Sequence, residues 1–556
     1  MKLKPHQPTV IIVVITILVA IIRFVFLDRV PPALNWDEVS HGYNAYSVLG
    51  TGADEWGNRF PAIFRAFGDY KLPVYIYLTS FSVFFFGLTP FAVRFVSVLA
   101  GVIAIPLIYL LVNELFEQQG GAKPPRMFGV GHLAAILLAL TPWHFFIGRP
   151  ALEANLALTL IIAGTLFLLR GLKDSRSWIV SATFFGLTLH TYNTARVFVP
   201  LLLIAFYLIY RKKIKHGKYT LVSLVIMALS LGLALYQVLM GSGTARYAKL
   251  AILSPGAVYT IGQDRLNSRF PPALARLVHN RPVYFTGAFL RNYLSYFSPT
   301  FFNQSRGAQT QFAIPNQDLF TFPTLFLALI GLVLTLKNQK DLSGKFIIVW
   351  LILSPVAAAT TIDPPQALRP NPMIPAVIVL AAYALFEIFK IRKVIAYVFL
   401  GSIAIAFISY LSVYFTDYRK TYSQSWQYGY QEAIEYINDH KSEYSRVIMT
   451  KKMGEPHIFY AFYSHLDPKK LQPGPFTTRY KLSDWFWTDR LDNVYFVNDW
   501  DIPTTHTEKI RLESGGAVST EKALIITSPD RVPVNTTKIE TINYLDGSPV
   551  FVIAHF

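Results

Sequence analysis

Long apolar stretches separated by short basic loops constrain this chain more than any other feature. Most of these stretches hold roughly 16–24 mainly apolar residues, enough to cross a hydrocarbon core about 30 Å thick. In lipid they must be helical, because their backbone groups have no water to bond. Only 15% of the 556 residues are charged, against about 25% in soluble proteins. The sequence therefore predicts a polytopic α-helical membrane protein.

The net charge of +18 comes from 51 Lys plus Arg against 33 Asp plus Glu. Nucleic-acid binding is disfavoured, because much of the excess sits in short loops between apolar stretches, as the positive-inside rule describes. Placing every basic cluster in the cytoplasm puts the N-terminus there too. The clusters are Lys2/Lys4, Lys123/Arg126, Arg170/Lys173/Arg176, residues 211–218, Lys337/Lys340/Lys345 and Lys390/Arg392/Lys393.

This orientation predicts about eleven spans. They are 9–28, 92–116, 128–147, 153–170, 177–192, 197–210, 219–240, 320–336, 345–361, 373–389 and 394–415. Residues 73–87 are apolar but only 15 residues long, and an extra crossing there would break the parity. We therefore expect them to form an interfacial or re-entrant helix.

The expected domain organisation follows from these spans. Residues 1–416 are predicted to form the transmembrane domain, with external loops 29–91 and 241–319 and short external turns at 148–152, 190–196 and 362–372. Residues 417–556 are more polar and are predicted to form a small extracytoplasmic α/β domain. Its expected elements are a helix at 431–439 and strands at 446–450, 494–497, 523–527 and 550–554.

Familiar motifs of soluble enzymes are absent from the sequence. There is no P-loop, GxGxxG, HExxH or GxSxG pattern. Cysteine is absent too, which excludes disulfides, thiolate nucleophiles and Cys-ligated metals. The triplet Asp499-Trp500-Asp501 resembles a metal–nucleotide motif, but a loop acid pair is the favoured interpretation of so short a match.

The first external loop carries two adjacent carboxylates, Asp37 and Glu38, within ten residues of a predicted span. On a helix their side chains diverge by about 100°, so they meet different partners. One can be a general base and the other a structural or metal-binding acid. An equally weighted interpretation is a solvated helix N-terminus, where the dipole favours acids.

Other ionisable residues recur on the same predicted face. Lys71 can bind a phosphate or simply extend to the headgroups. Arg149 and Glu153 either pair across a helical hairpin, which is slightly favoured, or line a polar cavity between helices. His190 is more often a hydrogen-bonded interface residue than a metal ligand. Arg369 can hold a phosphate or mark the membrane interface.

The long external loop combines arginine with aromatic residues, a set that suits either a lipid phosphate headgroup or plain interfacial anchoring. Its members are Arg246, Arg265, Arg269, Arg276, Arg281, Arg291 and Arg306, with Tyr293, Tyr296 and Phe297 among them.

The order of these motifs resembles that of a known family. A span is followed by Pro-Pro-x-Leu-x-x-Asp-Glu and by Lys-x-Pro before an aromatic helix. Further agreement comes from Arg94, from Arg149-x-x-x-Glu153 and from the turn Tyr192-x-x-x-Arg196. The pattern resembles the membrane-embedded C-type glycosyltransferases, especially the protein O-mannosyltransferase and aminoarabinose-transferase group. It extends over roughly residues 9–210 and, more loosely, 320–415.

The resemblance implies transfer of a sugar from a polyprenyl-phosphate carrier to an acceptor on the outer face of the membrane. By that analogy Asp37 is the general base and Glu38 orients its neighbours or the acceptor. Lys71 and Arg369 neutralise the leaving phosphate. Arg149 would bind the donor phosphate and, with Glu153, Tyr192 and Arg196, shape the donor pocket, and His190 could assist there or bind a metal. Some relatives carry Asp where Glu153 stands, and metal dependence varies among them, so a divalent metal is left open.

The chemistry is consistent with this implication. A sugar phosphoester needs no cofactor, because its phosphate is the leaving group. Direct displacement needs a base on one side of the anomeric carbon and cations on the other.

Two alternative functions remain. One is a transporter or flippase of a lipid-linked sugar, which is disfavoured because the sequence shows no internal repeat, and the other is a membrane protein that binds cell-wall polymer. The sequence suits a bacterial plasma membrane but identifies neither sugar nor acceptor.

Overall fold

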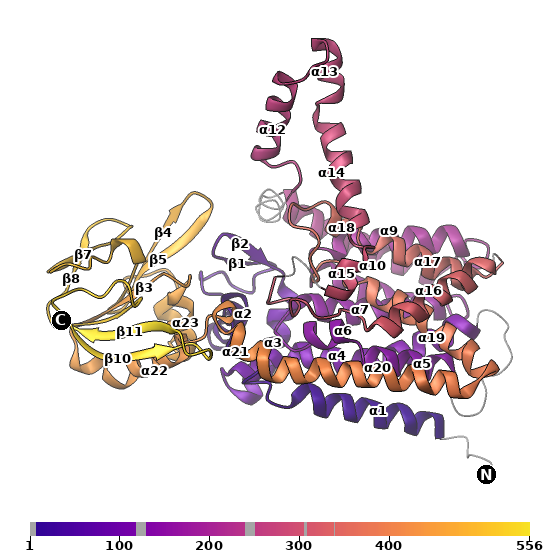
Figure 1. The fold of residues 1–556 in the computed structure, drawn as a ribbon, viewed down its shortest axis with the longest axis horizontal. Coiled ribbons are helices and arrows are strands. Elements are labelled where there is room, and N and C mark those ends of the chain that lie inside the picture. The colour runs from indigo at the N-terminus through magenta and orange to yellow at the C-terminus, as the bar shows by residue number, and fades with distance from the viewer. Residues whose placement is uncertain (1–6, 118–128, 240–250, 305–308, 339) are drawn as a thin grey trace. The chain divides into compact units, whose positions relative to one another are not determined.

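The computed structural model describes residues 7–117, 129–239, 251–304, 309–338 and 340–556 (Figure 1). It forms two compact units. The first holds the described parts of Met1–Val25 and Ser97–Leu411, and the second holds Phe26–Val96 with Ser412–Phe556. The predicted domain boundary at residue 416 remains a prediction. Six basic residues of the predicted cytoplasmic clusters and of the long external loop lie outside the described residues: Lys2, Lys4, Lys123, Arg126, Arg246 and Arg306.

The first unit is helical. Its helices are α1 (Gln7–Phe24), α5 (Val130–Ala139), α6 (Pro142–Ile147), α7 (Glu153–Arg170), α8 (Ser177–Leu189), α9 (Ala195–Tyr210), α10 (Lys218–Leu239), α12 (Pro255–Leu266), α13 (Pro272–Val278), α14 (Arg281–Ser295), α15 (Pro299–Gln304), α16 (Phe322–Lys337), α17 (Leu342–Leu353), α18 (Val356–Ala359) and α19 (Met373–Ile391). Two more, α4 (Pro90–Glu117) and α20 (Lys393–Val413), contribute to both units.

Six helical segments among the described residues are long and apolar enough to span a membrane. They are Pro90–Glu117, Glu153–Arg170, Lys218–Leu239, Leu342–Ala359, Met373–Ile391 and Lys393–Thr421. Shorter apolar helices cover most of the other predicted spans, so a helical membrane protein is confirmed and the number of about eleven stays a prediction. Exposed apolar residues on α1, α10 and α20, such as Ile17, Leu229 and Ile405, are typical of surfaces that face lipid.

Prolines interrupt two of the predicted spans. The stretch predicted at 128–147 is divided into α5 and α6, because Pro142 has no backbone N–H with which to continue α5. Pro355 likewise separates α17 from α18 within the stretch predicted at 345–361. A hydropathy pattern alone does not show such interruptions.

The second unit contains the first external loop and the C-terminal region. The loop forms α2 (Trp36–Thr51), the hairpin of β1 (Phe64–Ala66) and β2 (Asp69–Lys71), and α3 (Pro73–Phe86). Residues 73–87 are thus helical as expected, and the position of α3 in the membrane remains a prediction. Phe81, Phe84 and Phe85 are exposed along this helix.

The C-terminal region folds around a seven-stranded mixed sheet of order β10-β11-β9-β3-β6-β5-β4. Its central strand β3 pairs in parallel with β6 and β9, and the other neighbours are antiparallel. The elements are α21 (Arg419–Thr421), α22 (Tyr430–His440), β3 (Arg446–Thr450), α23 (Pro456–Tyr463), α24 (Pro468–Leu471), β4 (Thr477–Leu482), β5 (Trp485–Leu491), β6 (Val494–Val497), β7 (Lys509–Arg511), β8 (Ala517–Ser519), β9 (Ala523–Thr527), β10 (Thr537–Asn543) and β11 (Pro549–His555).

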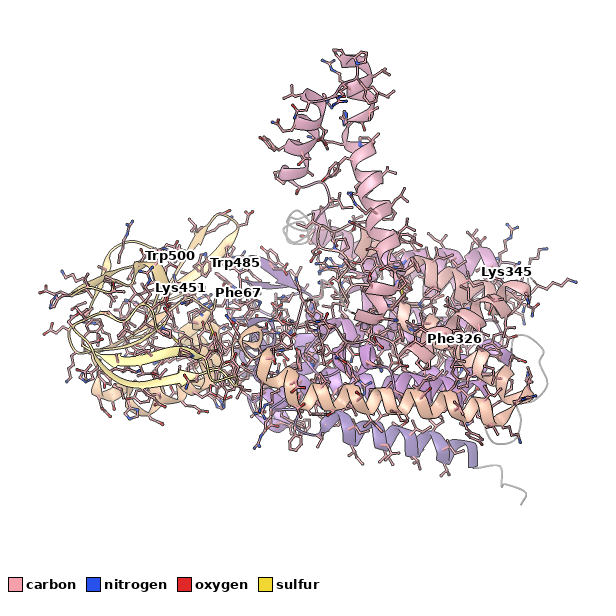
Figure 2. All side chains as sticks on the ribbon, in the orientation of Figure 1. Phe67, Phe326, Lys345, Lys451, Trp485 and Trp500 are labelled. Atoms are coloured by element: carbon pink, nitrogen blue, oxygen red, sulfur yellow. The ribbon has the colours of Figure 1, made fainter. Side chains whose placement is uncertain are left out.

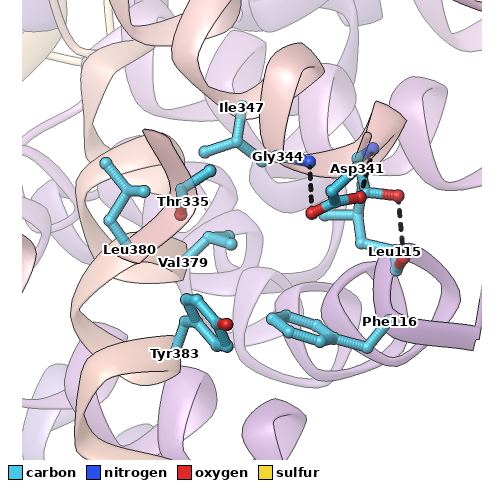
Figure 3. Close-up of a pocket in the computed structure, with 10 residues that line it drawn as sticks. Leu115, Phe116, Thr335, Asp341, Gly344, Ile347, Val379, Leu380 and Tyr383 are labelled. Atoms are coloured by element: carbon cyan, nitrogen blue, oxygen red, sulfur yellow. Dashed lines mark hydrogen bonds between the residues drawn. The ribbon is translucent and has the colours of Figure 1, made fainter. Parts of the chain in front are cut away.

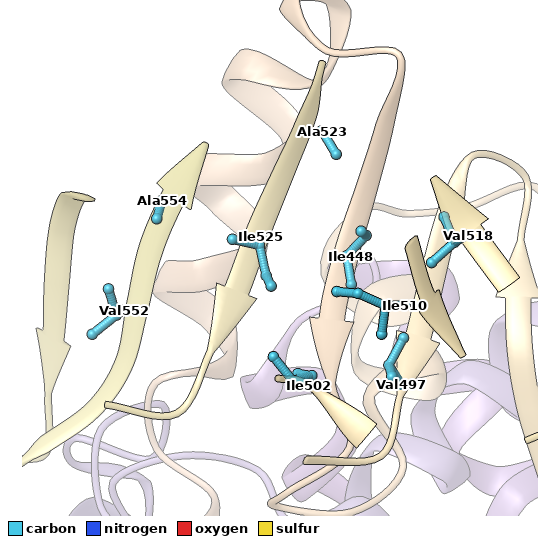
Figure 4. Packing of buried hydrophobic residues seen from close by; sticks show 9 residues of the cluster. All are labelled: Ile448, Val497, Ile502, Ile510, Val518, Ala523, Ile525, Val552 and Ala554. Atoms are coloured by element: carbon cyan, nitrogen blue, oxygen red, sulfur yellow. The ribbon is translucent and has the colours of Figure 1, made fainter. Parts of the chain in front are cut away.

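Both faces of this sheet are covered. On one face Ile448, Ile525 and Val552 pack against Ile510 and Val518 of the β7–β8 hairpin (Figure 4). Because strand side chains alternate, the next residues point to the other face. There the ring of Tyr430 in α22 lies 5.4 Å from Phe551 and 4.3 Å from Phe459 of α23. The core therefore fixes the helices and loops that extend towards α2.

Candidate active site

The N-terminus of α2 is built by a local capping motif. The side chain of Asn35 accepts a hydrogen bond from the backbone N–H of Glu38 at 3.0 Å, and Glu38 accepts one from the N–H of Asn35 at 3.1 Å. This reciprocal pair satisfies two donors that a helix end would otherwise leave open. It fixes the direction in which the neighbouring Asp37 leaves the helix.

Glu38 also forms a buried ion pair with Arg94 of α4. The Nε of Arg94 lies 2.9 Å from Oε1 of Glu38, and both side chains are fully buried. The guanidinium donates further hydrogen bonds to the carbonyls of Leu27, Pro31 and Ala33. Glu38 is thus enclosed by its partners, which agrees with an orienting role and leaves it little access to substrate.

Asp37 forms an ion pair with Lys71, the residue that ends β2. Nζ of Lys71 lies 2.7 Å from Oδ1 of Asp37 and 3.7 Å from Oδ2 of Asp69. The Lys71 side chain is only 6% exposed, whereas that of Asp37 is 43% exposed. The carboxylate therefore reaches solvent while the ammonium is held behind it. Two sequence-predicted residues that are 34 positions apart are brought into contact.

The C-terminal region supports both sides of this pair. The backbone N–H of Trp36 donates to Oε1 of Gln427 at 2.8 Å, and Nε2 of Gln427 donates to the carbonyl of Met453 at 2.6 Å. Near β2, the backbone N–H of Phe486 donates to the carbonyl of Phe67. The rings of Phe67 and Trp485 stack at 6.2 Å, and Figure 2 labels both. These supporting residues carry no local sequence signal, because their partners are several hundred residues away.

Glu455 is a buried acid within this support. Its Oε1 accepts a hydrogen bond from Nε1 of Trp485 at 2.5 Å, and its buried Oε2 has no hydrogen-bond partner among the described residues. Burial raises the pKa of Glu455 to about 8. Burial also lowers the pKa of His457, 3.5 Å away, well below its usual value. Both groups are therefore mostly uncharged at neutral pH.

Arg149 lies in the first unit and caps α1. It is fully buried, and its guanidinium donates to the carbonyls of Ile22, Arg23 and Val25 at 2.9–3.2 Å. These are carbonyls at the end of a helix, where a cation is favoured. Glu153 begins α7, four residues later. The proposed contribution of this pair to a donor pocket remains a prediction.

The turn after α8 joins three helices. Nε of Arg196 donates to the carbonyl of Leu189 at 3.0 Å, and its Nη2 donates to Gln237 of α10. His190 directly follows α8 as its C-terminal cap, and its buried Nδ1 has no hydrogen-bond partner among the described residues. Tyr192 is buried in the same turn. The structure thus gives Arg196 a clear packing role, and a role in substrate binding stays a prediction.

Arg369 is held by its own loop. It forms an ion pair with Asp363 and donates to Oγ1 of Thr361 at 2.7 Å. Nδ2 of Asn292, in the long external loop, donates to the backbone carbonyl of Thr361 at 2.9 Å. The loop that holds Arg369 therefore contacts the long external loop.

The triplet at residues 499–501 has a structural role. Oδ1 of Asp499 accepts hydrogen bonds from Thr450 and Ser528 at 2.8 and 2.7 Å. Oδ2 of Asp501 accepts one from Asn498. Both acids brace the ends of strands, as a loop acid pair would.

A small cavity lies among α4, α16, α17 and α19 (Figure 3). Its volume is about 20 Å³, enough for one water molecule and far too little for a sugar. Asp341 caps α17 beside it by accepting hydrogen bonds from Ser343 and Gly344. The cavity is therefore a packing feature.

Across the described ranges, no group of three or more His, Asp or Glu is placed to hold a metal ion.

Comparison with known families supports the resemblance seen in the sequence. The family model for dolichyl-phosphate-mannose-protein mannosyltransferase matches residues 71–236, a region that begins at Lys71. The chain resembles the C-type glycosyltransferases. A comparison with curated protein sequences finds no match.

Several solved structures are similar to this chain. ArnT from Cupriavidus metallidurans bound to undecaprenyl phosphate is 12% identical, with a TM-score of 0.53, over 99% of this chain and 98% of that one. Its apo form gives a TM-score of 0.52 over 98% of each chain. The oligosaccharyltransferase of Archaeoglobus fulgidus, 12% identical, gives 0.46 over 83% of this chain. The chain spans only 63% of that protein's length. The agreement with ArnT along almost the whole chain shows a common fold.

Proposed function

We propose that the chain transfers a sugar from a polyprenyl-phosphate-linked donor to an acceptor hydroxyl on the extracytoplasmic face of a membrane. The observation that carries the proposal is the ion pair of Asp37 with Lys71, in which a half-exposed carboxylate lies beside a buried ammonium. The family match supports the reaction class. Undecaprenyl phosphate in the ArnT structure supports the donor class.

The proposed reaction uses the two members of the pair differently. The donor phosphate approaches Lys71 and displaces Asp37 from it, which frees the carboxylate. Asp37 takes the proton of the acceptor hydroxyl as that oxygen attacks the anomeric carbon. The bond from the anomeric carbon to the phosphate oxygen breaks, and polyprenyl phosphate leaves with the electron pair. Its negative charge is stabilised by Lys71, and a single displacement inverts the anomeric centre.

The remaining residues have proposed supporting roles. The pair of Glu38 with Arg94 holds the start of α2, so Glu38 orients Asp37. Phosphate binding by Arg369 and Arg149, and donor binding by Glu153, His190, Tyr192 and Arg196, stay as proposals. We also propose a bacterial plasma membrane, with a cytoplasmic N-terminus and the C-terminal domain outside.

Donor turnover tests this function. Wild type and Asp37→Asn are compared in nanodiscs with a panel of radiolabelled polyprenyl-phosphate sugars. We expect wild type to consume one donor, and the variant to bind it but turn it over at least about a hundredfold more slowly, as for loss of a general base. Asp69→Asn is the matched control, because Asp69 also faces Lys71 but lies 3.7 Å from it. It should retain most of the turnover.

Other results would change the assignment. Equal turnover by wild type and Asp37→Asn would show that Asp37 is not the base. If neither protein consumes any donor, but a labelled lipid-linked sugar crosses the bilayer of proteoliposomes, the chain is a transporter. Retention of cell-wall polymer without turnover would identify a binding protein.

A further inference from the structure

The helices α12, α13 and α14 expose many apolar side chains. Tyr259, Leu266, Leu277 and Leu294 are 69%, 78%, 67% and 63% exposed. Each Å² of apolar surface left in water costs about 25 cal/mol, and monomeric soluble proteins rarely expose large contiguous apolar patches. This part of the chain therefore has the composition of a surface that contacts something less polar than water.

The exposed aliphatic side chains of α14 lie along one stripe. Val283, Leu290 and Leu294 are spaced by seven and four residues, which places them on one face of the helix. Phe297 follows Leu294 by three residues, in the turn just after the helix. The backbone N–H of Phe297 donates to the carbonyl of Leu294 and so extends the turn. The apolar surface is thus ordered along the helix.

The segment is internally well formed. The guanidinium of Arg265, at the end of α12, donates twice to the carbonyl of His279 at the end of α13. Asn280 caps α14 by accepting a hydrogen bond from the N–H of Val283 at 2.9 Å. The exposed apolar side chains are therefore carried by well-formed helices.

The C-terminal part of α14 is hydrogen-bonded to the rest of the first unit near the loop of Arg369. Nδ2 of Asn292 donates to the carbonyl of Thr361 at 2.9 Å, and the hydroxyl of Tyr293 donates to the carbonyl of Ile352 at 2.8 Å. In Figure 1, α14 leaves the bundle and runs across the direction of α1 and α20. If α1 and α20 cross the bilayer, α14 extends in its plane.

The excess positive charge of residues 255–291 indicates an anionic partner. Between residues 255 and 291 the sequence has five arginines, at 265, 269, 276, 281 and 291, against the single acid Asp264. All five arginines are exposed. Helices with exposed apolar residues and excess basic charge lie in the headgroup region of a bilayer, where arginine binds lipid phosphate.

We propose that residues 255–297 form an in-plane membrane anchor, whose partner is the phosphate layer of anionic lipids at the extracytoplasmic surface. The apolar side chains enter the boundary between headgroups and acyl chains, and the arginines bind the phosphates above it. This surface shares no residue with the Asp37–Lys71 pair, and the proposal does not depend on sugar transfer.

The absence of cysteine from the chain allows a direct test. Leu277→Cys and Leu294→Cys are labelled with an environment-sensitive fluorophore and placed in nanodiscs with brominated lipids. We expect strong quenching by lipids brominated near the headgroups and weaker quenching by those brominated near the chain ends. Val534→Cys, at a site that is 75% exposed in the C-terminal domain, is the matched control and should not be quenched.

Two further arms identify the partner. Arg276→Gln and Arg281→Gln are next added to each labelled cysteine variant. The emission of the label should then no longer differ between anionic and zwitterionic nanodiscs. Quenching by brominated lipids should persist, because the apolar side chains are unchanged. Absence of quenching at both Leu277 and Leu294 would overturn the proposal. Excimer emission from pyrene at these positions, without lipid quenching, would instead show that a second copy of the chain covers the surface.

Discussion

Nζ of Lys71 lies 2.7 Å from Oδ1 of Asp37, so the proposed phosphate ligand and the proposed base neutralise each other in this structure. Donor phosphate must compete with Asp37 for the ammonium. Lys71→Gln removes the cation, and we expect turnover to fall by about a hundredfold, the usual loss for one group that stabilises developing negative charge. Steady-state transfer in nanodiscs measures this, with the exposed Lys469→Gln as control. Unchanged turnover in Lys71→Gln would place the phosphate elsewhere.

The same competition makes a prediction about product binding. Asp37→Asn removes the anion beside Lys71, so polyprenyl phosphate no longer has to displace it. We expect this variant to bind polyprenyl phosphate more tightly than wild type, although its turnover is lost. Microscale thermophoresis with a labelled short-chain polyprenyl phosphate measures the change. Unchanged or weaker binding would mean that Asp37 does not compete with the lipid phosphate for Lys71.

The pair of Glu38 with Arg94 predicts a loss of stability. Both side chains are fully buried, with Nε of Arg94 2.9 Å from Oε1 of Glu38. Glu38→Gln leaves the guanidinium buried without a counter-charge, which typically costs about 3–5 kcal/mol. We expect a clearly lower midpoint of thermal unfolding. A variant that melts like wild type but no longer transfers sugar would instead assign Glu38 a direct catalytic role.

Sequence patterns were informative where the structure is local. The amphipathic pattern at 431–439 predicts α22, and the apolar runs at 446–450, 494–497, 523–527 and 550–554 coincide with β3, β6, β9 and β11. These strands are buried on both faces, so their composition alone marks them. The partly exposed β4, β5, β7, β8 and β10 were not predicted, because mixed polar and aromatic residues give no comparable signal.

Contacts between residues far apart in the chain are harder to predict from the sequence. The sequence singles out Asp37 and Lys71 separately, but nothing in their spacing predicts that the β1–β2 hairpin places Lys71 against Asp37 of α2. The roles of Gln427 and Trp485 depend on Trp36 and Phe67, which come from the opposite end of the chain, and Glu455 is held in turn by Trp485. Pairing of this kind is set by tertiary packing, which local propensity does not encode.

Gly454 lies against Trp36, the residue before Asp37. Its φ is +79°, and a Cβ there would lie 2.6 Å from the Trp36 ring. Gly454→Ala therefore strains the backbone and pushes the indole. Because Trp36 adjoins the proposed base, we expect lower kcat with little change in donor affinity. Gly515→Ala, at φ +107° with open space around its Cβ, is a matched control for backbone strain alone. Equal losses of kcat in Gly454→Ala and Gly515→Ala would show that backbone strain alone, and not displacement of Trp36, lowers kcat.

Glu455 gives a pH-dependent prediction. Burial raises its pKa from 4.5 to about 8, the nearby Glu55 adds to the rise, and Trp485, Lys451 and Arg479 oppose it. A folded-state pKa above the unfolded one means that the folded protein binds the proton more tightly. The stability from the neutral carboxyl is therefore complete below about pH 4.5 and is lost as pH rises through about 8.

Glu455→Gln keeps a neutral side chain at every pH, so the variant should lose less thermal stability than wild type as the pH rises from 5 to 9. The measurement is the midpoint of unfolding across this range, with the exposed Glu521→Gln as control. Burial lowers the pKa of His457, which also faces this carboxyl, well below its usual value, so the neutral imidazole is favoured. Parallel pH profiles for wild type and Glu455→Gln would show that Glu455 is already ionised in the folded protein, stabilised by Lys451 and Arg479.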